Sequence, residues 1–252
     1  MDILKAARDG HLKELKNHIA AGANLRITDY SLNTPLHLAA KGPSPHNIPS
    51  VKALLQAGAT IEAKNEDNET PLHLAARSTN TDCIQLLIDS GSDINAKSDY
   101  GTPLTIAASF GNDEAVKIFI SLGADIQAKD HQMYTPLHLA AVEGYASTCQ
   151  VLCDAGANLN ENQNQWGKTP LHIAASGENG NGHQTCAKII LKAGGDPSLL
   201  DYDSKSPEEL SHGSRVRDAR LELLTEEKAA LQLEGPQNLP DRPTPRISRG
   251  RL

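Results

Sequence analysis

The chain has 252 residues, 38% of them apolar, and a formal net charge of −7 at pH 7. No apolar run approaches the roughly 20 residues that cross a bilayer, so we predict no membrane span. An acidic chain lacks the basic footprint of general nucleic-acid binding, so we predict no nucleic-acid partner. The start shows no secretory signal and cysteines are few, which favours a cytoplasmic, reducing location.

One motif, Thr-Pro-Leu-His-Leu-Ala-Ala, returns nearly intact four times after its first copy. The copies begin at Thr34, Thr70, Thr102, Thr135 and Thr169, at steps of 36, 32, 33 and 34 residues. A degraded copy begins at Ser206. Such a period predicts a stack of small helical units, each of which buries its apolar face on the next.

The first unit lacks Thr-Pro but keeps the frame of the repeat through Gly10 and Gly22. It carries several charged positions between residues 5 and 16. Charged outer positions suit the solvated end of an array. We therefore interpret this unit as the N-terminal cap.

The unit that begins at Thr70 shows the pattern that the others share. Thr70 is placed to cap a helix that Pro71 begins, because a missing N–H costs nothing at the first helical position. Ile84 and Leu87 recur at helical spacing and predict a second, outer helix, which Gly91 ends. A polar, turn-rich segment follows. The predicted unit is helix, turn, helix and projecting loop.

Two insertions lengthen the predicted turn between the helices of a unit. They cover residues 41–49 in the second unit and residues 176–183 in the sixth. Loops of this kind serve as contact elements in some proteins. Tolerated surface loops fit equally well, because loop growth costs little free energy.

Residues 1–224 form the predicted repeat array, about six units with a degraded capping unit from residue 206. A polar helix is predicted over residues 214–233, so residues 225–234 complete this capping helix. Its sparse apolar stripe consists of Val216, Leu221, Leu224 and Leu231. A capping helix of this kind gives the array a polar outer end.

Residues 235–252 differ in composition from the rest of the chain. They are rich in Pro and Arg, and residues 236–252 carry a net charge of +3. We predict a disordered basic tail. It is either a short recognition motif or a solubilising end, because four arginines fall short of a convincing polybasic anchor.

The repeated motif, with endings such as residues 54–59 (Leu-Leu-Gln-Ala-Gly-Ala), resembles the ankyrin repeat over about residues 1–224. The resemblance implies an all-α, ankyrin-type helical solenoid of helix-turn-helix-finger units with a C-terminal capping helix. In that family the projecting loop is a β-hairpin-like finger, and fingers and inner helices line a concave face that binds partners. We expect a monomer apart from its protein partner, and no cofactor.

Four histidines occupy the same place in the motif: His37, His73, His138 and His172. In related repeats this imidazole hydrogen-bonds within and between units, so we interpret the four as structural. Three further histidines, His131, His183 and His212, lie in loops and have no second ligand three or four residues away. No metal site is predicted.

Cys149 and Cys153 lie four residues apart on one face of a predicted outer helix. A redox or metal pair is one reading of this spacing. Core packing is favoured, because Cys149 falls where Ile84 and Val116 fall in other units. The chain shows no phosphate-binding loop and no nucleophile elbow, so no enzyme activity is predicted.

Aromatic residues are few, and most of them lie in the finger segments rather than the core, to which only Phe119 clearly belongs. Because Tyr and Trp dominate interface hot spots, we predict a binding surface. The alternative is that neighbouring fingers pack their rings on one another. The predicted partner-binding residues are Tyr30, Arg77, Tyr100, Phe110, Tyr134, Glu143, Trp166 and Tyr202.

The finger segments together carry a charge of −6, which Lys64, Lys97 and Lys129 just before them reduce to −3. This charge favours a partner with basic residues. The leading hypothesis is a non-catalytic adaptor or scaffold that holds a partner segment on the concave face. The alternative is a regulatory subunit, or an effector secreted into a host. Its activity would lie in a partner, and its basic tail would be a targeting motif.

Family resemblance also predicts a modification. Ankyrin repeats are substrates of an intracellular asparaginyl hydroxylase, and the pattern it favours is matched by Leu87 and Asp93 ahead of Asn95. Asn160 is the second choice, because Asn158 replaces the acidic residue there. The alternative is that Asn95 only serves the turn.

Overall fold

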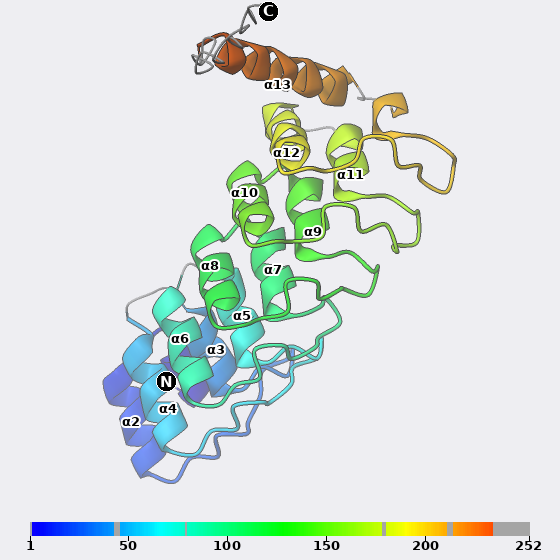
Figure 1. Cartoon of the computed structure of the whole chain (residues 1–252). Coiled ribbons are helices and arrows are strands. Elements are labelled where there is room, and N and C mark those ends of the chain that lie inside the picture. The colour runs from blue at the N-terminus through cyan, green and yellow to red at the C-terminus, as the bar shows by residue number, and fades with distance from the viewer. Residues whose placement is uncertain (1, 43–45, 79, 178–179, 211–213, 234–252) are drawn as a thin grey trace, which may run out of the picture.

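The computed structural model describes residues 2–42, 46–78, 80–177, 180–210 and 214–233. Helices stack in pairs along one direction, and loops project from one side of the stack (Figure 1). The first three pairs are α1 (Ile3–Arg8) with α2 (Leu12–Ala20), α3 (Pro35–Lys41) with α4 (Ile48–Gln56), and α5 (Pro71–Arg77) with α6 (Thr81–Asp89). The next three are α7 (Pro103–Ser109) with α8 (Asp113–Ser121), α9 (Pro136–Glu143) with α10 (Ala146–Asp154), and α11 (Pro170–Ser176) with α12 (Gly180–Lys192).

A short 3-10 helix, η1 (Pro207–Glu209), and the long helix α13 (Ser214–Leu233) follow the sixth pair. Within the described ranges β pairing is limited to an isolated bridge between Ser98 and Gly101. The predicted all-α solenoid is confirmed.

The inner helices are short because the repeat fixes where each begins. Before α11, Thr169 Oγ1 accepts a hydrogen bond from the backbone N–H of His172 (3.3 Å), and Pro170 is the first helical residue. Ala174 and Ala175 are fully buried, as are the alanines at the same places in the other inner helices. Small side chains let neighbouring inner helices approach closely.

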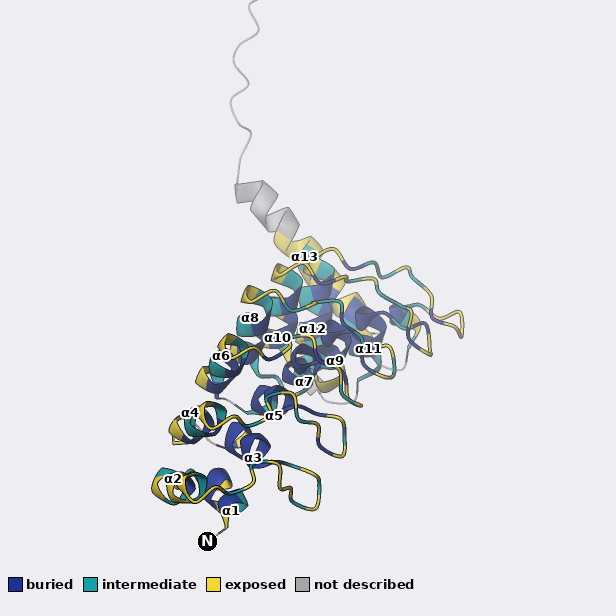
Figure 2. Ribbon diagram, turned by 90° about the horizontal axis from the view of Figure 1, so that it is seen from below, coloured by how far each residue is buried: buried dark blue, intermediate teal, exposed yellow. Residues whose placement is uncertain are grey.

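The outer helices are amphipathic, with a buried face toward the inner helices and an exposed face toward solvent (Figure 2). Each outer helix fully buries at least one large apolar residue; among these are Leu15, Leu54, Leu87, Phe119, Leu152 and Ile190. Removing such a side chain from water contributes about 2 kcal/mol. Phe119 therefore belongs to the core, as predicted.

A side chain at the base of each long finger closes its turn. In the finger before Thr135, Asp130 accepts hydrogen bonds from the backbone N–H groups of Gln132 (2.9 Å) and Tyr134 (2.8 Å). The turn holds Met133 at a φ of +64°, a left-handed conformation that few non-glycine residues adopt. Asp29, Asn65, Asn164 and Asp201 close their fingers in the same way.

The motif histidines join each inner helix to the finger that follows it. Nδ1 of His138 accepts the backbone N–H of Thr135 (3.3 Å), and its Nε2–H donates to the backbone carbonyl of Lys168 (3.0 Å). His37, His73 and His172 make equivalent bonds. Burial lowers the pKa of His138 to about 4, so this imidazole is neutral at pH 7. The structural interpretation of the four histidines is confirmed.

The second insertion was expected to lengthen a turn as far as His183, and that expectation was wrong. Helix α12 begins at Gly180, so part of the insertion extends this outer helix to 13 residues, against nine in α10. Residues 43–45 of the first insertion and residues 178–179 of the second lie outside the described residues.

Helix α13 spans the predicted residues, but its buried face differs from the predicted stripe. Val216 and Ala219 are buried, whereas Leu221 and Leu224 are 62% and 45% exposed. Val216, Ala219 and the partly buried Leu223 follow at steps of three and four residues and share one side of the helix. The side chain of Leu231 and the tail lie outside the part of the chain that the structure describes.

Candidate functional site on the concave face

The candidate site is the angle between two layers of the molecule. One layer is the row of inner helices α3, α5, α7, α9 and α11, and the other is the set of fingers that project beside them (Figures 1 and 2). The outer helices lie behind the inner row. We call this angle the concave face.

Arg77, at the end of α5, is the centre of a side-chain cluster on this face. Its guanidinium carbon lies 5.6 Å from the ring centroid of Tyr100 and 5.7 Å from that of Phe110. Both distances are within the range of a cation–π interaction. The guanidinium also pairs with Glu69. We call these four residues the Arg77 cluster.

Glu69 is the member of the cluster that the sequence analysis missed. Its side chain is 1% exposed, and its second carboxylate oxygen accepts a hydrogen bond from Asn65 Nδ2 (3.2 Å). A buried carboxylate needs a paired cation, which Arg77 supplies. The sequence did contain a signal, because the finger at residues 65–69 is the most acidic of the six, with a net charge of −3.

The two rings of the cluster remain accessible. Tyr100 is 47% exposed and Phe110 is 54% exposed. The Tyr100 hydroxyl donates to Asp67 Oδ1 (3.3 Å), and the negative charge of that carboxylate raises the pKa of Tyr100. The rings are thus held by neighbours on one side and open to a partner on the other part of their surface.

Tyr145, at the start of α10, extends this apolar surface. Its ring lies against Gly111, where an added Cβ would come within 2.8 Å of the ring carbons, and Gly111 directly follows Phe110. Val142 and Tyr145 are each 37% exposed. Tyr145 was not among the predicted contact residues, because sequence position alone does not show that its ring lies beside Gly111.

Tyr134 was predicted to be an exposed contact residue, and the expected exposure was wrong. It is 8% exposed, and its ring stacks on His138 (centroids 5.4 Å apart) and on Trp166 (5.6 Å). Tyr134 directly precedes Thr135, and its backbone N–H is held by Asp130, so its ring lies against the inner layer. Burial raises the pKa of its phenol to about 12. The alternative of rings packed between fingers holds here.

The other predicted contact residues lie elsewhere on the fingers and helix ends. Trp166 keeps 43% of its surface exposed despite its stack on Tyr134. Tyr30 is fully exposed and Tyr202 is 70% exposed, each at the tip of an end finger. Glu143 is exposed at the end of α9. None of these four belongs to the Arg77 cluster.

The repeat geometry agrees with a comparison of the sequence with known families. The family model of ankyrin repeats matches the chain in three copies, over residues 3–98, 44–130 and 104–201. The chain belongs to the ankyrin repeat family. Ankyrin repeat domains are general protein–protein interaction modules, and their fold is generally non-catalytic.

Solved ankyrin structures align with most of this chain. The human ASB11 ankyrin repeat domain aligns at a TM-score of 0.76 and 25% sequence identity. The alignment covers 87% of this chain and 97% of the ASB11 chain. The ankyrin repeat domain of Bcl-3, described as a unique member of the IkappaB protein family, aligns at a TM-score of 0.71 and 29% identity, with the same coverage.

Curated relatives match only part of the ankyrin array. Oxysterol-binding protein-related protein 1 of Rattus norvegicus is 35% identical over 72 residues, and Rabankyrin-5 of Homo sapiens is 50% identical over 46 residues. The matches span 29% and 18% of this chain but 7% and 4% of those proteins. The similarity to these proteins is therefore limited to their ankyrin repeats.

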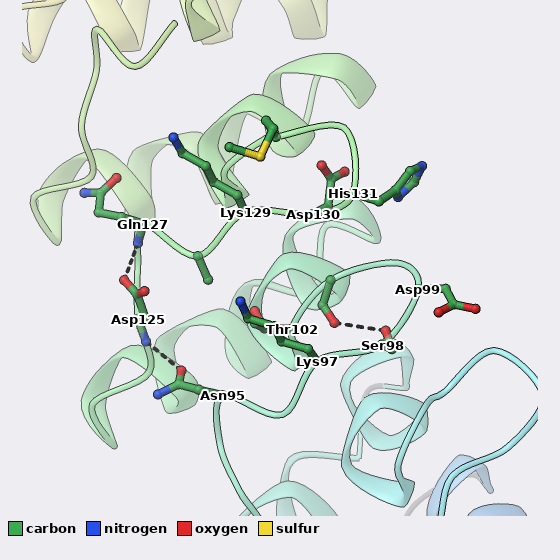
Figure 3. Close-up of a pocket in the computed structure, with 13 residues that line it drawn as sticks. Asn95, Lys97, Ser98, Asp99, Thr102, Asp125, Gln127, Lys129, Asp130 and His131 are labelled. Carbon is green, nitrogen blue, oxygen red and sulfur yellow. Dashed lines mark hydrogen bonds between the residues drawn. The ribbon is translucent and has the colours of Figure 1, made fainter. Parts of the chain in front are cut away.

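The ankyrin fingers are not joined evenly along the array. Backbone N–H groups of Glu66 and Asp99 donate to the carbonyls of Ser31 and Asp67, both at 3.1 Å, and link the first three fingers. No backbone bond links the described fingers at 98–101 and 130–134. An open pocket of about 680 Å³ lies between them (Figure 3).

Two lysines at equivalent positions, Lys97 and Lys129, line this pocket. Lys129 pairs with Glu161 of the next finger (3.1 Å), whereas Lys97 forms no ion pair with the described residues. The reason is that Ala128 stands where Glu161 stands one unit later. The lining contains no Phe, Tyr or Trp, so the pocket lacks the features of the Arg77 cluster.

Asn95, the predicted modification site, joins two ankyrin units. Its backbone N–H donates to Asp93 Oδ1 (2.9 Å), and its side-chain Oδ1 accepts the backbone N–H of Asp125 (2.9 Å; Figure 3). Asn160 bonds Asp196 in the same way (2.9 Å). Asn95 therefore serves the turn and the unit boundary, whether or not it is modified.

Within the described part of the chain, no group of three His, Cys, Asp or Glu side chains is placed to hold a metal ion. None of the helices described there combines the length and apolar character that a membrane crossing needs.

Proposed function

We propose that this ankyrin chain is a non-catalytic adaptor or scaffold that binds a segment of a protein partner on its concave face. The observation that carries the proposal is the Arg77 cluster. Its side chains are already ordered by the ion pair and the two ring contacts. A partner therefore loses little free energy to side-chain ordering when it binds. Tyr and Arg are also the residue types that interface hot spots favour.

The proposed contact extends from the cluster toward the fifth unit. Phe110 and Tyr145 are both partly exposed, and the Tyr145 ring lies against Gly111, which directly follows Phe110. We propose that the two rings form an apolar surface beside Arg77. An apolar side chain of the partner fits this surface, because an anchor residue in a partly enclosed apolar site carries much of an interface's free energy.

The charge around the cluster supports a partner with basic residues. Arg77 is neutralised by Glu69, so the cluster itself carries no net charge. Asp67 and Asp99 lie on the adjoining finger tips and remain acidic. We propose that basic residues flank the partner's apolar anchor, because complementary charge raises association rates and excludes acidic competitors.

We further propose that the chain is a cytoplasmic monomer apart from its partner. Its four cysteines are free thiols in the structure, as in proteins of reducing compartments. Analytical ultracentrifugation tests the monomer, which has a mass of 26.9 kDa. A sedimenting species of twice that mass would contradict it.

Capture of partners tests the proposed face. We expect a Tyr100→Ala and Phe110→Ala double variant to recover roughly ten-fold less partner from a cell lysate than the wild type. A Tyr30→Ala and Tyr202→Ala double variant is the matched control, because it also removes two exposed rings, and it should retain binding. Equal recovery by the wild type and the Tyr100/Phe110 variant, measured by quantitative mass spectrometry, contradicts the proposal.

A chain that ends at residue 235 separates the adaptor from the regulatory or effector alternative. The adaptor proposal predicts that this shortened chain captures the same partners as the full chain. Loss of those partners on removal of the basic tail would favour the alternative, in which the tail is the targeting motif.

We also propose Asn95 as a substrate of an asparaginyl hydroxylase, on the strength of the family resemblance. The bond from Asp125 to the Asn95 side chain means that the finger must open before an enzyme reaches this residue. Incubation with such a hydroxylase should add one oxygen to the Asn95 peptide. An unmodified peptide at full enzyme activity ends this proposal.

A further inference from the structure

Three of the four cysteines gather at the boundary between the fifth and sixth ankyrin units. The sulfur atoms of Cys149 in α10 and Cys186 in α12 are 3.3 Å apart, and both side chains are fully buried. Cys153 lies one turn after Cys149 and is partly buried. The sequence spacing brings Cys149 together with Cys153 but gives no sign of Cys186, which is 37 residues from Cys149.

The two positions recur at each boundary between outer helices. Cys149 stands seven residues before the closing Gly156 of its unit, and Cys186 stands eight residues before Gly194. The equivalent pairs at the four earlier boundaries are Leu15 with Ser50, Val51 with Cys83, Ile84 with Ala115, and Val116 with Thr148, all fully buried. Among these five boundaries, only the one between units five and six has cysteine at both positions.

Geometry separates this pair from the other combinations. Residues four apart on a helix have Cβ atoms about 5–6 Å apart, whereas a disulfide needs about 3.5–4.5 Å. Cys149 and Cys153 therefore cannot pair while α10 is intact. Cys83 lies opposite the valine of its boundary and lacks a cysteine partner there.

We propose that Cys149 and Cys186 are an oxidation site, at which a peroxide converts two buried thiols into a disulfide that links unit five to unit six. One sulfur attacks an oxygen of hydrogen peroxide, which gives a sulfenic acid and one water. The second sulfur then attacks the sulfenic sulfur, the S–S bond forms, and the hydroxyl group leaves with the remaining thiol proton as a second water. The two cysteines lose two electrons and two protons, which reduce the peroxide.

The closed structure makes this reaction slow. The contact with Cys186, together with burial, raises the pKa of the Cys149 thiol, so the reactive thiolate is scarce. Oxidation therefore requires the sixth unit to open, and units near the end of a repeat array open most readily. When the unit closes, the two sulfurs return to contact.

The link would stabilise the end of the array that carries Trp166 and Tyr202. It joins two outer helices across a closed loop of 37 residues, which restricts the unfolded chain. We expect the melting temperature of the oxidised chain to rise by several degrees over that of the reduced chain. The inference is independent of the proposed partner site, because neither cysteine belongs to that site and both side chains are fully buried.

Peptide mapping of the full chain tests the proposal. The chain is incubated with hydrogen peroxide under native conditions, free thiols are alkylated, and peptides are identified without reduction. We expect a cross-linked peptide pair that contains Cys149 and Cys186, with Cys83 alkylated. A cross-link formed through Cys153 instead of Cys149 or Cys186 would overturn the proposal. So would oxidation of Cys153 while Cys149 and Cys186 remain free thiols that become alkylated.

Two matched variants test the stabilising effect. Cys149→Val and Cys186→Ala introduce residues that occupy the same positions at other boundaries, so the fold should persist. Each should abolish the rise in melting temperature on oxidation. A rise that survives in either variant would overturn the assignment. Val51→Cys places a cysteine opposite Cys83 as a positive control. A link between those two, with none between Cys149 and Cys186, would also overturn the proposal.

Discussion

Two aromatic groups occupy neighbouring parts of the concave face, and they differ in what lies against the rings. In the Arg77 cluster a guanidinium lies within cation–π distance of both Tyr100 and Phe110, which remain about half exposed. Beyond it, Tyr134 stacks directly on Trp166 and is 8% exposed. Both rings of the first group are exposed to solvent, whereas in the second group Tyr134 is buried and Trp166 keeps 43% of its surface exposed.

The difference follows from the place of each ring in its finger. Tyr134 directly precedes the Thr-Pro motif, and so does the buried Glu69, whereas Tyr100 stands one residue earlier. The residue next to the motif points toward the inner layer in both fingers and is buried. An aromatic residue there strengthens the scaffold. One residue away, the same residue type becomes part of a surface.

A fall in pH should weaken the histidine contacts that support both aromatic groups. We expect it to lower the free energy of unfolding more than any of the substitutions below. His73 bonds the backbone beside Tyr100, and His138 lies beneath Tyr134; burial lowers the pKa of each to about 4. The folded chain therefore binds fewer protons than the unfolded chain between pH 6.5 and 4. The neutral histidines stabilise the fold above pH 6.5, and the stability that they contribute is lost as the pH falls toward 4.

The expected loss between pH 7 and pH 5 is on the order of 2 kcal/mol for each of these histidines. Urea unfolding followed by circular dichroism at the two pH values measures it. An unfolding midpoint that stays constant or rises at pH 5 would show that the motif histidines are not held neutral.

Tyr134→Ala should have the next largest effect, because it empties the closed stack. Loss of a buried aromatic side chain costs about 3 kcal/mol. The midpoint of urea unfolding should fall accordingly. A cost close to that of Tyr30→Ala, which removes a fully exposed ring, would contradict the burial of Tyr134.

Arg77→Met should destabilise the open cluster by about 2 kcal/mol, because it leaves the Glu69 carboxylate buried without a cation. The expected value lies below that of a fully buried ion pair, since Arg77 is partly exposed. Adding Glu69→Gln should restore most of the loss. If the loss of unfolding free energy in the double variant equals the sum of the losses in the two single variants, the two side chains are not coupled.

Tyr100→Ala and Phe110→Ala should have the smallest effects on stability, about 0.5 kcal/mol each, because both rings are half exposed. The comparison with Tyr134→Ala is therefore sharp: we expect loss of Tyr100 or Phe110 to reduce partner binding, and loss of Tyr134 to reduce stability. A loss of several degrees of melting temperature in Phe110→Ala would place this ring with the packed residues.

The sequence predicted the fold well because each unit repeats the same local instructions. The helices are determined by the Thr-Pro starts, the closing glycines and the apolar spacing. The motif histidines determine how the helices connect to the fingers. The candidate site was predicted less completely. Glu69 and Cys186 contribute through contacts with other units, and no local pattern shows which residues of successive units meet. Tyr134 is buried because it stands one residue closer to the Thr-Pro motif than Tyr100 does in its own finger.

Site-specific photo-cross-linking tests whether the Arg77 cluster contacts a protein partner. Phe110→p-benzoylphenylalanine places a photoreactive group in the open cluster, and the same replacement of Gln150 places one on the exposed side of the outer helix α10. Irradiation in cells, followed by mass spectrometry, identifies what each group touches. The account predicts that position 110 cross-links to a protein partner and that position 150 does not cross-link to that partner. Cross-links to the same partner from position 150 but not from position 110 would contradict it.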